Sequence, residues 1–478
     1  MTSENRILAI IVVGVLMGAI DSTVVLLALP AITQALHATL YTSIWIILVY
    51  LLVLAVATTQ LGKLGDIFGR SNMFNLGFAV FTVGSAMCGF SGDVLVLVFS
   101  RAVQAVGGAL VTSNSGAIVA DTFPPERRGH AFGFTGFGYN VGALLGIVIG
   151  GVITTFVGWQ YIFFINVPIG IVAVGLGVVY IKDKKKIQQK LDIPGMASFG
   201  ASLVLLTFSM IDFATFGATP FNIALATVGA VLMVLFVLWE RASEHPMLNF
   251  RIFKSRILKY SISASFFQSL GYMSVVFIVI LYLQGIRGLD PFSASVLLIP
   301  GYVVGSLSAP YMGRLSDRFG ARILATLGIS LMCIAILVYL ALTATTSYYI
   351  VVLATILTGI GGAMFWPANN STVMAHAPRE EYGSTSGFLR TASSVGMLGS
   401  FVIAITAASL AVSRSTAFGI LLGTSRLIGG VSTSFLHGID TAFIVSIAIL
   451  IVAGILSFSR GREDRTKAHV HASIQGKI

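Results

Sequence analysis

Fourteen apolar segments follow one another along this chain of 478 residues, and they constrain its fold more than any other feature. An α-helix of about 20 apolar residues crosses the hydrocarbon core of a bilayer, which is about 30 Å thick. Charged residues are only 10% of the chain, whereas a soluble protein carries about a quarter. We therefore predict an all-α polytopic membrane protein with fourteen transmembrane helices (spans 1 to 14), at residues 6–30, 42–62, 73–91, 94–120, 130–155, 160–181, 194–214, 220–240, 257–283, 291–312, 322–343, 347–375, 383–411 and 438–459.

Basic residues between the spans indicate the orientation of the chain. With the N-terminus in the cytoplasm, the cytoplasmic segments hold 24 of the 29 Lys and Arg residues, and the outer loops hold only three. Cytoplasmic loops of membrane proteins carry such an excess. We predict a multi-pass protein of the cell membrane with both termini cytoplasmic. The surplus of 29 basic over 18 acidic residues is therefore a topology signal, and we expect no nucleic acid partner.

Residues for metal, redox or nucleotide chemistry do not form recognisable motifs. Cys88 and Cys333 both fall inside apolar runs, and the seven histidines are scattered without an HExxH pattern. A phosphate-binding GxxxxGK[ST] loop is also missing from the sequence. We expect neither an enzyme nor a bound cofactor or metal, and the energy for any transport would come from an ion gradient. A non-transporting membrane receptor or scaffold remains an alternative.

Two short charged cassettes nearly repeat each other about 250 residues apart, at residues 62–70 and 313–322. Both read Gly-x-Leu-x-Asp-x-x-Gly, and both lie between two spans. Glycines permit a tight turn, and an aspartate can face a neighbouring helix N-terminus. We expect Asp66 to face the start of span 13 near Gly383. The alternative is two ordinary positively charged loops.

The cassettes also divide the chain, because duplicated segments at matching places are typical of transporters with internal repeats. They follow spans 2 and 10, so the repeats are spans 1–6 and 9–14. We predict an N-terminal six-helix bundle, a cytoplasmic linker with two inserted transmembrane helices, a C-terminal six-helix bundle and a cytoplasmic tail, at residues 1–181, 182–256, 257–459 and 460–478. The Gly- and Ser-rich stretch 412–437 is expected to be a long external loop.

Two charged residues lie deep inside the first repeat. Asp21 is fifteen residues after Arg6, which places it about 22 Å above the inner boundary, and Arg101 is about 10 Å below the outer boundary. These depths agree in a core about 30 Å thick, so Asp21 and Arg101 can meet. Protonation of Asp21 would release the arginine and couple proton binding to helix movement. The alternative is a structural ion pair that never titrates.

Polar and aromatic residues near the middle of several spans are candidates for a central cavity between the repeats. Each alone could instead form a hydrogen bond between helices. Arg390, about 10 Å into span 13, has no deep acidic partner in the second repeat. It either extends toward lipid phosphates and loop carbonyls or contacts an anionic group of the substrate. The set suggests a roomy, mostly apolar cavity, and its other members are Asn114, Tyr139, Asn140, Gln268, Tyr272, Trp366, Asn369 and Asn370.

Several motifs together resemble the major facilitator superfamily, and in particular its branch of fourteen-span drug:proton antiporters. The cassettes resemble motif A, Asp21-Ser22-Thr23 with Ala28-Leu29-Pro30 resembles the span-1 pattern, and Arg101 to Gly108 resembles motif B. Residues 159–170, which read WQYIFFINVPIG, resemble the branch's WRWIFxINVPxG. Span 5 carries the glycines of the antiporter motif C, which are Gly133, Gly142, Gly146, Gly150 and Gly151.

This resemblance implies a fold of two six-helix bundles plus two inserted helices. It implies a monomer that exports hydrophobic or amphipathic small molecules in exchange for protons, with proton coupling at Asp21 and with membrane lipids as its surroundings. It also implies that the span-5 glycines line the seam between the repeats. The gating motif would comprise Gly62, Asp66, Gly69, Arg70, Asp121, Gly313, Asp317 and Gly320. A lipid, siderophore or metabolite carrier on the same fold is the alternative.

Three positions depart from the branch. Ile147 stands where motif C has a proline, and Leu26 stands where the branch has an asparagine. In span 13, the usual Asn-x-x-Arg becomes Arg390-Thr391-Ala392-Ser393. We expect span 5 to have repacked around the branched side chain of Ile147.

Overall fold

The computed structural model of this protein describes residues 3–182, 192–244, 246–248, 250–410, 413–414, 416–417 and 433–461. All regular secondary structure in these residues is helical, which confirms the all-α prediction. Thirteen of the described helical segments are long and apolar enough to cross a membrane. Most of the predicted external loop 412–437 and the tail beyond residue 461 lie outside the described residues.

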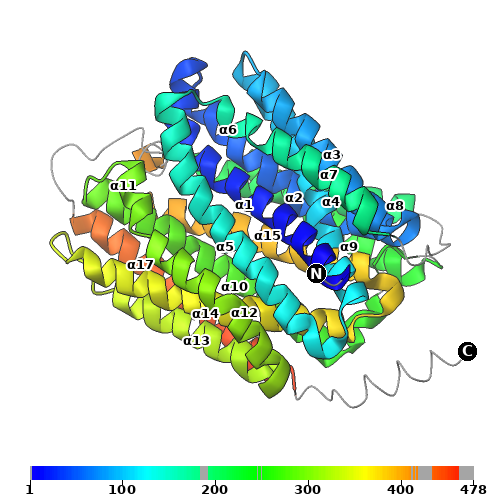
Figure 1. The fold of residues 1–478 in the computed structure, drawn as a ribbon. Coiled ribbons are helices and arrows are strands. Elements are labelled where there is room, and N and C mark those ends of the chain that lie inside the picture. The colour runs from blue at the N-terminus through cyan, green and yellow to red at the C-terminus, as the bar shows by residue number, and fades with distance from the viewer. Residues whose placement is uncertain are drawn as a thin grey trace, which may run out of the picture.

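The helices of the first half lie together and form the blue-to-teal part of the ribbon (Figure 1). The short α6 and the following α7 together occupy the single predicted span 160–181. The bounds are α1 (Ser3–Ala35), α2 (Leu40–Phe68), α3 (Arg70–Gly89), α4 (Val94–Thr122), α5 (Pro125–Phe156), α6 (Tyr161–Phe164) and α7 (Asn166–Tyr180).

The helix α3 stands at the predicted span 73–91 but is not among the thirteen apolar segments. Asn72 and Asn75 make its first turns polar. It nevertheless packs along α4 and α7 inside the first half. The described chain thus has thirteen spans by length and composition, and a more polar helix at the remaining predicted position.

The helices of the second half form the green-to-red part of the ribbon (Figure 1). Their bounds are η1 (Phe250–Lys254), α10 (Arg256–Leu281), the π-helix η2 (Tyr282–Ile286), α11 (Pro291–Val296), α12 (Ile299–Phe319), α13 (Ala321–Tyr339), α14 (Tyr348–His376), η3 (Arg379–Glu381), α15 (Tyr382–Ala408) and α17 (Thr433–Ser459).

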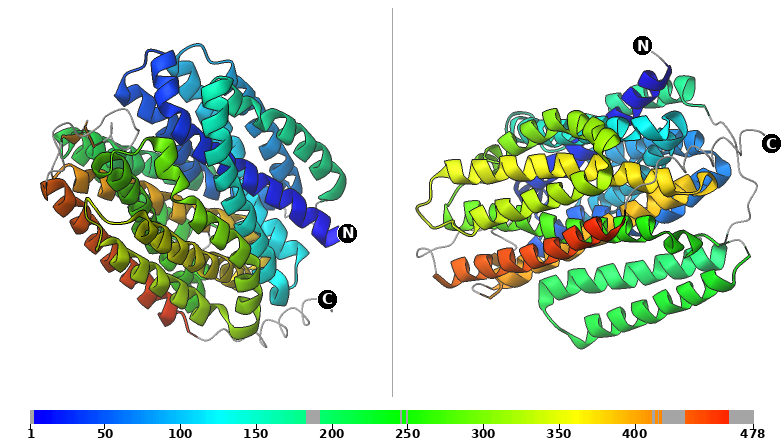
Figure 2. Two further views of the ribbon diagram at one scale, coloured as in Figure 1. Left: turned by 60° about the vertical axis from the view of Figure 1, so that its left-hand side comes forward. Right: turned by 90° about the horizontal axis from the view of Figure 1, so that it is seen from below.

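The most extensive contacts between the halves are those of α5 along α12 and of α2 along α15, and α5 also touches α14 while α4 touches α15. The inserted helices α8 (Ile193–Phe216) and α9 (Pro220–Ala242) form a hairpin on the flank of the molecule (Figure 2, right). Of the two, α8 contacts α2 and α15, while α9 packs mainly on α8. The hairpin therefore lies beside one of the two most extensive contacts between the halves.

The cassettes are largely helical, so the prediction that spans 2 and 10 end at residues 62 and 312 was wrong. The helix α2 continues to Phe68 and α12 continues to Phe319. The turn in each cassette is a single glycine, Gly69 with φ 106° and Gly320 with φ 91°. Glycine alone adopts such angles without strain, which allows the next helix to begin at once. The end of the molecule at which α2 and α12 finish is called the cassette end below.

The first and last described helices meet this same end. Glu4, at the start of α1, pairs with Arg127 at the start of α5 at 3.1 Å. At the other extreme of the chain, Arg256 at the start of α10 donates to the carbonyl of Ser459, the last residue of α17, at 2.9 Å. Both termini of the described chain therefore lie on one side.

Candidate functional site

The first cassette binds the second half of the protein through Asp66. One carboxylate oxygen of Asp66 accepts the backbone N–H of Gly383 at 2.8 Å, and the other accepts that of Ser384 at 2.8 Å. These N–H groups belong to the first turn of α15, where no carbonyl within the helix can accept them. The negative charge also faces the positive end of the helix dipole. The predicted contact with the region of Gly383 is therefore present.

Arg70 completes this contact from the start of α3. Its guanidinium donates to Asp66 at 2.6 and 2.8 Å, to Asp121 at the end of α4, and to the carbonyl of Arg379 at 2.7 Å. Arg70 is largely buried, so these pairs are only weakly screened by solvent. The structure thus brings Asp66, Arg70 and Asp121 together into one network, as the sequence predicted.

The second cassette makes the corresponding contact in the opposite direction. Asp317, near the end of α12, accepts the backbone N–H of Gly129 at 3.0 Å and that of His130 at 2.9 Å. Both donors lie near the start of α5, in the first half. The cassette end is therefore fastened twice between the halves, once from each side.

Glycines let the backbones touch at both contacts. A Cβ on Gly62 would overlap the carbonyl oxygen of Gly383, and a Cβ on Gly313 would overlap that of Gly129. Backbone approach of this kind requires residues without side chains. The glycines of the predicted gating motif therefore have two different roles, because Gly69 and Gly320 make the turns whereas Gly62 and Gly313 allow contact.

One cation at the cassette end was missed as a site residue. Arg128 was counted only as a topology signal, yet it is buried and donates to the carbonyls of Ala120 at 2.6 Å and Met374 at 2.8 Å. It also donates to the hydroxyl of Tyr382 at 3.1 Å. It therefore joins the ends of α4 and α14 and the start of α15.

The deep charges of the first half do form an ion pair. The Nη1 of Arg101 lies 2.6 Å from a carboxylate oxygen of Asp21, and the two residues are 1% and 0% exposed. Gln104, one turn after Arg101 on α4, donates to the other Asp21 oxygen at 2.8 Å and accepts a hydrogen bond from the guanidinium. The sequence predicted this ion pair correctly because the rise per residue of a helix is constant, so that the depth of a residue in the membrane follows from its number.

Arg101 is held by further groups from α2. It donates to the carbonyl of Ile46 at 3.1 Å, and its guanidinium lies 4.3 Å from the centre of the Tyr50 ring. A cation over an aromatic face is attracted by the ring quadrupole. Within the described part of the chain, by contrast, only Arg101 and Gln104 donate to Asp21. Loss of the Asp21 charge would therefore loosen α1 more than it would loosen Arg101.

The glycines of α5 face two different neighbours, which corrects the expectation that all of them line the seam between the repeats. Gly133 packs on Ala309 and Pro310 of α12, across the seam. Gly142, Gly146 and Gly150 instead pack on α1 within the same half, against Leu16, Thr23 and Val24, respectively. Gly151 lies in α5, but its surroundings are outside the described part of the chain. Nine residues, or two and a half turns, separate Gly133 from Gly142, so the two groups lie on opposite faces of α5.

Ile147 lies within this glycine-lined stretch. It is buried, and α5 runs as one helix from Pro125 to Phe156 around it. The structure thus has a packed branched side chain at the position where the resembled branch carries a proline.

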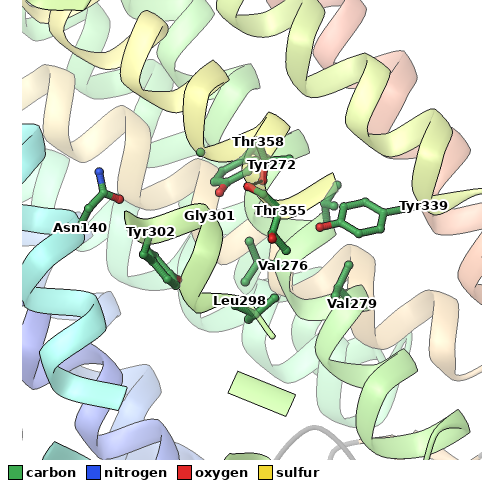
Figure 3. A pocket seen from close by; sticks show the side chains of 12 residues that line it. Asn140, Tyr272, Val276, Val279, Leu298, Gly301, Tyr302, Tyr339, Thr355 and Thr358 are labelled. Atoms are coloured by element: carbon green, nitrogen blue, oxygen red, sulfur yellow. Dashed lines mark hydrogen bonds between the residues drawn. The ribbon is translucent and has the colours of Figure 1, made fainter. Parts of the chain in front are cut away.

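A pocket lies where α5, α10, α12 and α14 approach one another (Figure 3). Tyr272 and Asn140, both predicted, contribute to it, and Tyr272 hydrogen-bonds Thr358. The rest of the lining combines hydroxyl groups with apolar side chains, and it includes Tyr302, Tyr339, Thr355, Val275, Val276, Val279 and Leu298. Tyr302, Thr355 and Thr358 were not predicted, although each is a polar residue inside an apolar span, which is the signal that identified Asn140 and Tyr272.

Three predicted cavity residues have no exposed surface, and their assignment to the cavity was wrong. Asn114 lies against Gly65 of α2, which places it between two helices of the first half. Gln268 donates to the sulfur of Met332, and Asn369 donates to the hydroxyl of Ser265 at 2.8 Å. Gln268 and Asn369 connect helices instead of lining a cavity, whereas Asn114 donates within α4, to the carbonyl of Leu110 at 2.9 Å and the hydroxyl of Ser113 at 3.2 Å.

The remaining candidates have varied positions. Trp366 packs on the apolar core of the second half, and Asn370, one turn further along α14, is buried with a carbonyl oxygen that has no hydrogen-bond partner among the described residues. Tyr139 is 45% exposed and interacts electrostatically with Arg390, which projects from α15. These two residues belong to opposite halves of the protein.

Arg460 corrects the predicted start of a polar tail at that residue. It is completely buried and donates to the carbonyls of Ser457 at 2.9 Å and Ala321 at 3.2 Å, and to the side chain of Asn369 at 3.2 Å. A cation at a helix C-terminus is favourable. It therefore belongs to the packed end of α17.

The sequence pattern of the Major Facilitator Superfamily matches residues 11–401. The chain is 31% identical over 387 residues to the riboflavin transporter RibZ of Clostridioides difficile (strain 630), which covers 80% of this chain and 84% of that protein. It is 30% identical over 494 residues to the tetracenomycin C resistance and export protein of Streptomyces glaucescens, which covers 96% and 92%. The putative multidrug resistance protein MdtD of Shigella flexneri is 27% identical over 452 residues, which covers 93% of each chain.

Solved structures show the same arrangement of helices. The proton:xylose symporter XylE superposes with a TM-score of 0.66 at 13% identity, which covers 95% of this chain and 94% of that one. The human organic anion transporter MFSD10 superposes with a TM-score of 0.61 at 15% identity, which covers 94% and 100%. At these identities the likeness shows the fold alone, and it confirms the fold class predicted from the sequence.

Proposed function

Since this chain belongs to the major facilitator superfamily, a family of secondary transporters and not of enzymes, we propose that it exports hydrophobic or amphipathic compounds from the cell in exchange for protons. The observation that carries this proposal is the Asp21–Arg101 ion pair, which is buried within membrane-spanning helices. Ionisable residues at such depth are costly and are functional by default.

Asp21 is the proposed proton carrier. A proton on its carboxylate would cancel the negative charge and weaken the bonds from Arg101 and Gln104. Arg101 would keep its contacts with Gln104, the Ile46 carbonyl and the Tyr50 ring. The change in α1 would reach α5 directly, because the next residues of α1 rest on the glycines of α5. A purely structural ion pair is the competing interpretation.

The fastened cassette end is the proposed cytoplasmic gate. Asp66 and Asp317 each bind backbone N–H groups of the opposite half, so this end opens only when both contacts break. The positive-inside distribution of Lys and Arg supports the cytoplasmic assignment. We likewise propose a division into bundles at 1–181 and 257–459, a cell-membrane location, and a monomer as the working unit.

Export of amphipathic compounds is supported by the pocket lining and by the relatives. Tyrosine and threonine hydroxyls around a valine and leucine wall suit a molecule with both apolar and polar parts. One relative is named for tetracenomycin C export and another for putative multidrug resistance. A metabolite carrier is the second candidate, and the specific observation that favours it is the likeness to a riboflavin transporter.

The decisive experiment uses purified protein in liposomes with an imposed pH gradient. Asp21→Asn should retain substrate exchange, which needs no gradient, but should lose gradient-driven accumulation. The control is Glu4→Gln, which removes an exposed carboxylate from the same helix and should retain both. Full gradient-driven accumulation by Asp21→Asn would overturn proton coupling at this residue, and loss of both activities would favour the structural ion pair.

A further inference from the structure

The pocket of Figure 3 is built around a backbone contact between α12 and α14. A Cβ on Gly359 would overlap the carbonyl oxygen of Gly301, and a Cβ on Gly301 would overlap that of Thr355. Backbones approach this closely only where side chains are absent. The neighbouring side chains Tyr302 and Thr358 are therefore held at a fixed separation. The open space that the pocket encloses measures about 50 Å³, which is enough for a group of a few atoms.

Most polar groups of this pocket already have partners inside the protein. The hydroxyls of Thr355 and Thr358 donate to carbonyls of their own helix, each at 2.8 Å. The amide nitrogen of Asn140 donates to a carbonyl of α5 at 3.1 Å, and the hydroxyl of Tyr272 hydrogen-bonds Thr358. The donors of these four side chains are therefore largely engaged before a ligand arrives.

Tyr302 and Tyr339 provide the free donors. Across the described ranges neither hydroxyl forms a hydrogen bond, and a tyrosine hydroxyl can donate one to an acceptor oxygen. Tyr339 is fixed by its ring, which stacks on Phe443 of α17 with 5.6 Å between the ring centres. In Figure 3 the two tyrosines lie on either side of Val276 and Leu298. A compound in the pocket thus meets a hydrogen-bond donor on each side of an apolar wall.

The lining of the pocket is also free of charge. None of the described residues that line it is ionised at neutral pH. An ionised group buried there would lose its hydration without meeting a partner of opposite charge, which is unfavourable. An uncharged carbonyl oxygen loses far less hydration and accepts a hydrogen bond from a tyrosine in return. The pocket therefore favours polar groups that carry no charge.

We propose that this pocket binds the uncharged, hydrogen-bond-accepting end of the exported compound, with Tyr302 and Tyr339 as donors, and that it excludes ionised groups. This inference rests on the proposed transport function and narrows the cargo to neutral compounds with carbonyl or ether oxygens on an apolar skeleton. It also implies electrogenic transport, because exchange of a neutral compound for a proton moves a positive charge into the cell. The competing interpretation is a lipophilic cation bound over the faces of the tyrosine rings.

Three coumarin probes with one fluorescent skeleton test the charge preference. They are 7-(diethylamino)coumarin-3-carboxamide, the corresponding carboxylate, and the carboxamide extended by a trimethylammonioethyl group. Their affinities are measured by titration of the purified full-length protein in detergent, corrected for binding to empty micelles. Wild type should bind the neutral amide at least tenfold more tightly than either ion. Asn140→Asp, which adds a carboxylate to the pocket, should raise the affinity for the cation relative to the neutral amide at least fivefold.

Tyr302→Phe and Tyr339→Phe test the donors while keeping the rings. Each should weaken binding of the neutral amide about three- to tenfold, the effect of one lost hydrogen bond. Tyr311→Phe, which alters an exposed tyrosine of α12, is the matched control and should leave binding unchanged. Wild-type affinity for either ion that equals or exceeds that for the amide would overturn the proposal, as would donor variants that behave like the control.

Binding needs no gradient, so the pocket and the proposed transport function fail in different ways. In liposomes, a membrane potential imposed without a pH gradient should drive accumulation of the neutral amide. If the amide binds with the expected preference but the potential drives no accumulation, exchange for protons is wrong and the pocket assignment stands. If the potential drives accumulation but the ions bind as tightly as the amide, the pocket assignment is wrong.

Discussion

Asp66 and Asp317 make the same contact in opposite directions. Each carboxylate lies near the end of a helix in one half and accepts two backbone N–H groups near the start of a helix in the other half. The pair thereby fastens the cassette end symmetrically. Symmetry of this kind means that the loss of one contact leaves the other to hold the halves together.

Asp66→Ala should shift the protein toward states that are open at the cassette end. Loss of a capping carboxylate costs about 1 kcal/mol, which corresponds to roughly a fivefold change in population. A cysteine in place of Ser386, which is buried behind the contact, should react faster with an impermeant maleimide from that side, in a background without Cys88 and Cys333. Asp317→Ala should have a similar effect, and the double variant a larger one. Equal reaction rates in all of these variants would contradict the gating role.

Gly313→Ala should separate the halves at the cassette end, because the added methyl group meets the carbonyl of Gly129 and backbone cannot move aside cheaply. Overpacking of this kind costs about 1–3 kcal/mol. Thermal unfolding in detergent should show a lower midpoint. Gly18→Ala is the matched control, since nothing lies within 4 Å of its Cβ position. A similar midpoint for both variants would show that the close approach is not tight.

Gln104→Met should destabilise the ion pair of the first half while leaving both charges in place. Asp21 and Arg101 would each lose one partner, and an unmade hydrogen bond to a buried charged group costs about 1–3 kcal/mol. We expect a lower unfolding midpoint together with a changed pH dependence of transport. An unaltered pH profile despite the lower midpoint would mean that Gln104 acts on stability alone.

Ile147→Pro should damage folding instead of tightening the seam. An interior proline costs about 3 kcal/mol or more in a helix, and Ile147 is buried in a continuous α5. The measurement combines proton leak in liposomes with thermal stability. Less leak at unchanged stability would show that the proline of the resembled branch fits this chain after all.

The sequence predicted contacts that depend on the geometry of single helices. The meeting of Asp21 and Arg101 follows from a fixed rise per residue, and the contact of Asp66 with the start of α15 follows from the unpaired N–H groups there. The first prediction needed only the depths of Asp21 and Arg101, and the second needed only an aspartate in a duplicated cassette next to a helix N-terminus.

Contacts that depend on the identity of a distant partner were not predictable. The spacing of Gly133 and Gly146 indicates that other helices pack closely on α5. It does not indicate that these helices are α12 at Gly133 and α1 at Gly146. Arg128 and Arg460 were interpreted as loop charges, because one carbonyl acceptor of each, on Met374 and Ala321, respectively, lies more than a hundred residues away. Asn114 and Asn369 are polar residues near the middle of their spans, as expected of cavity residues, yet their side chains turn toward neighbouring helices.

The hairpin of α8 and α9 is attached to both halves at different heights. Near the cassette end, Gln60 of α2 donates to the carbonyl of Met196 at 2.9 Å. At the far end of α8, Arg414, which follows α15, donates to the carbonyl of Ala214 at 2.8 Å. Because α8 is bound to the first half at one end and to the second half at the other, it must tilt whenever the two halves rotate relative to each other. The hairpin therefore changes its tilt in the surrounding lipid during each transport cycle.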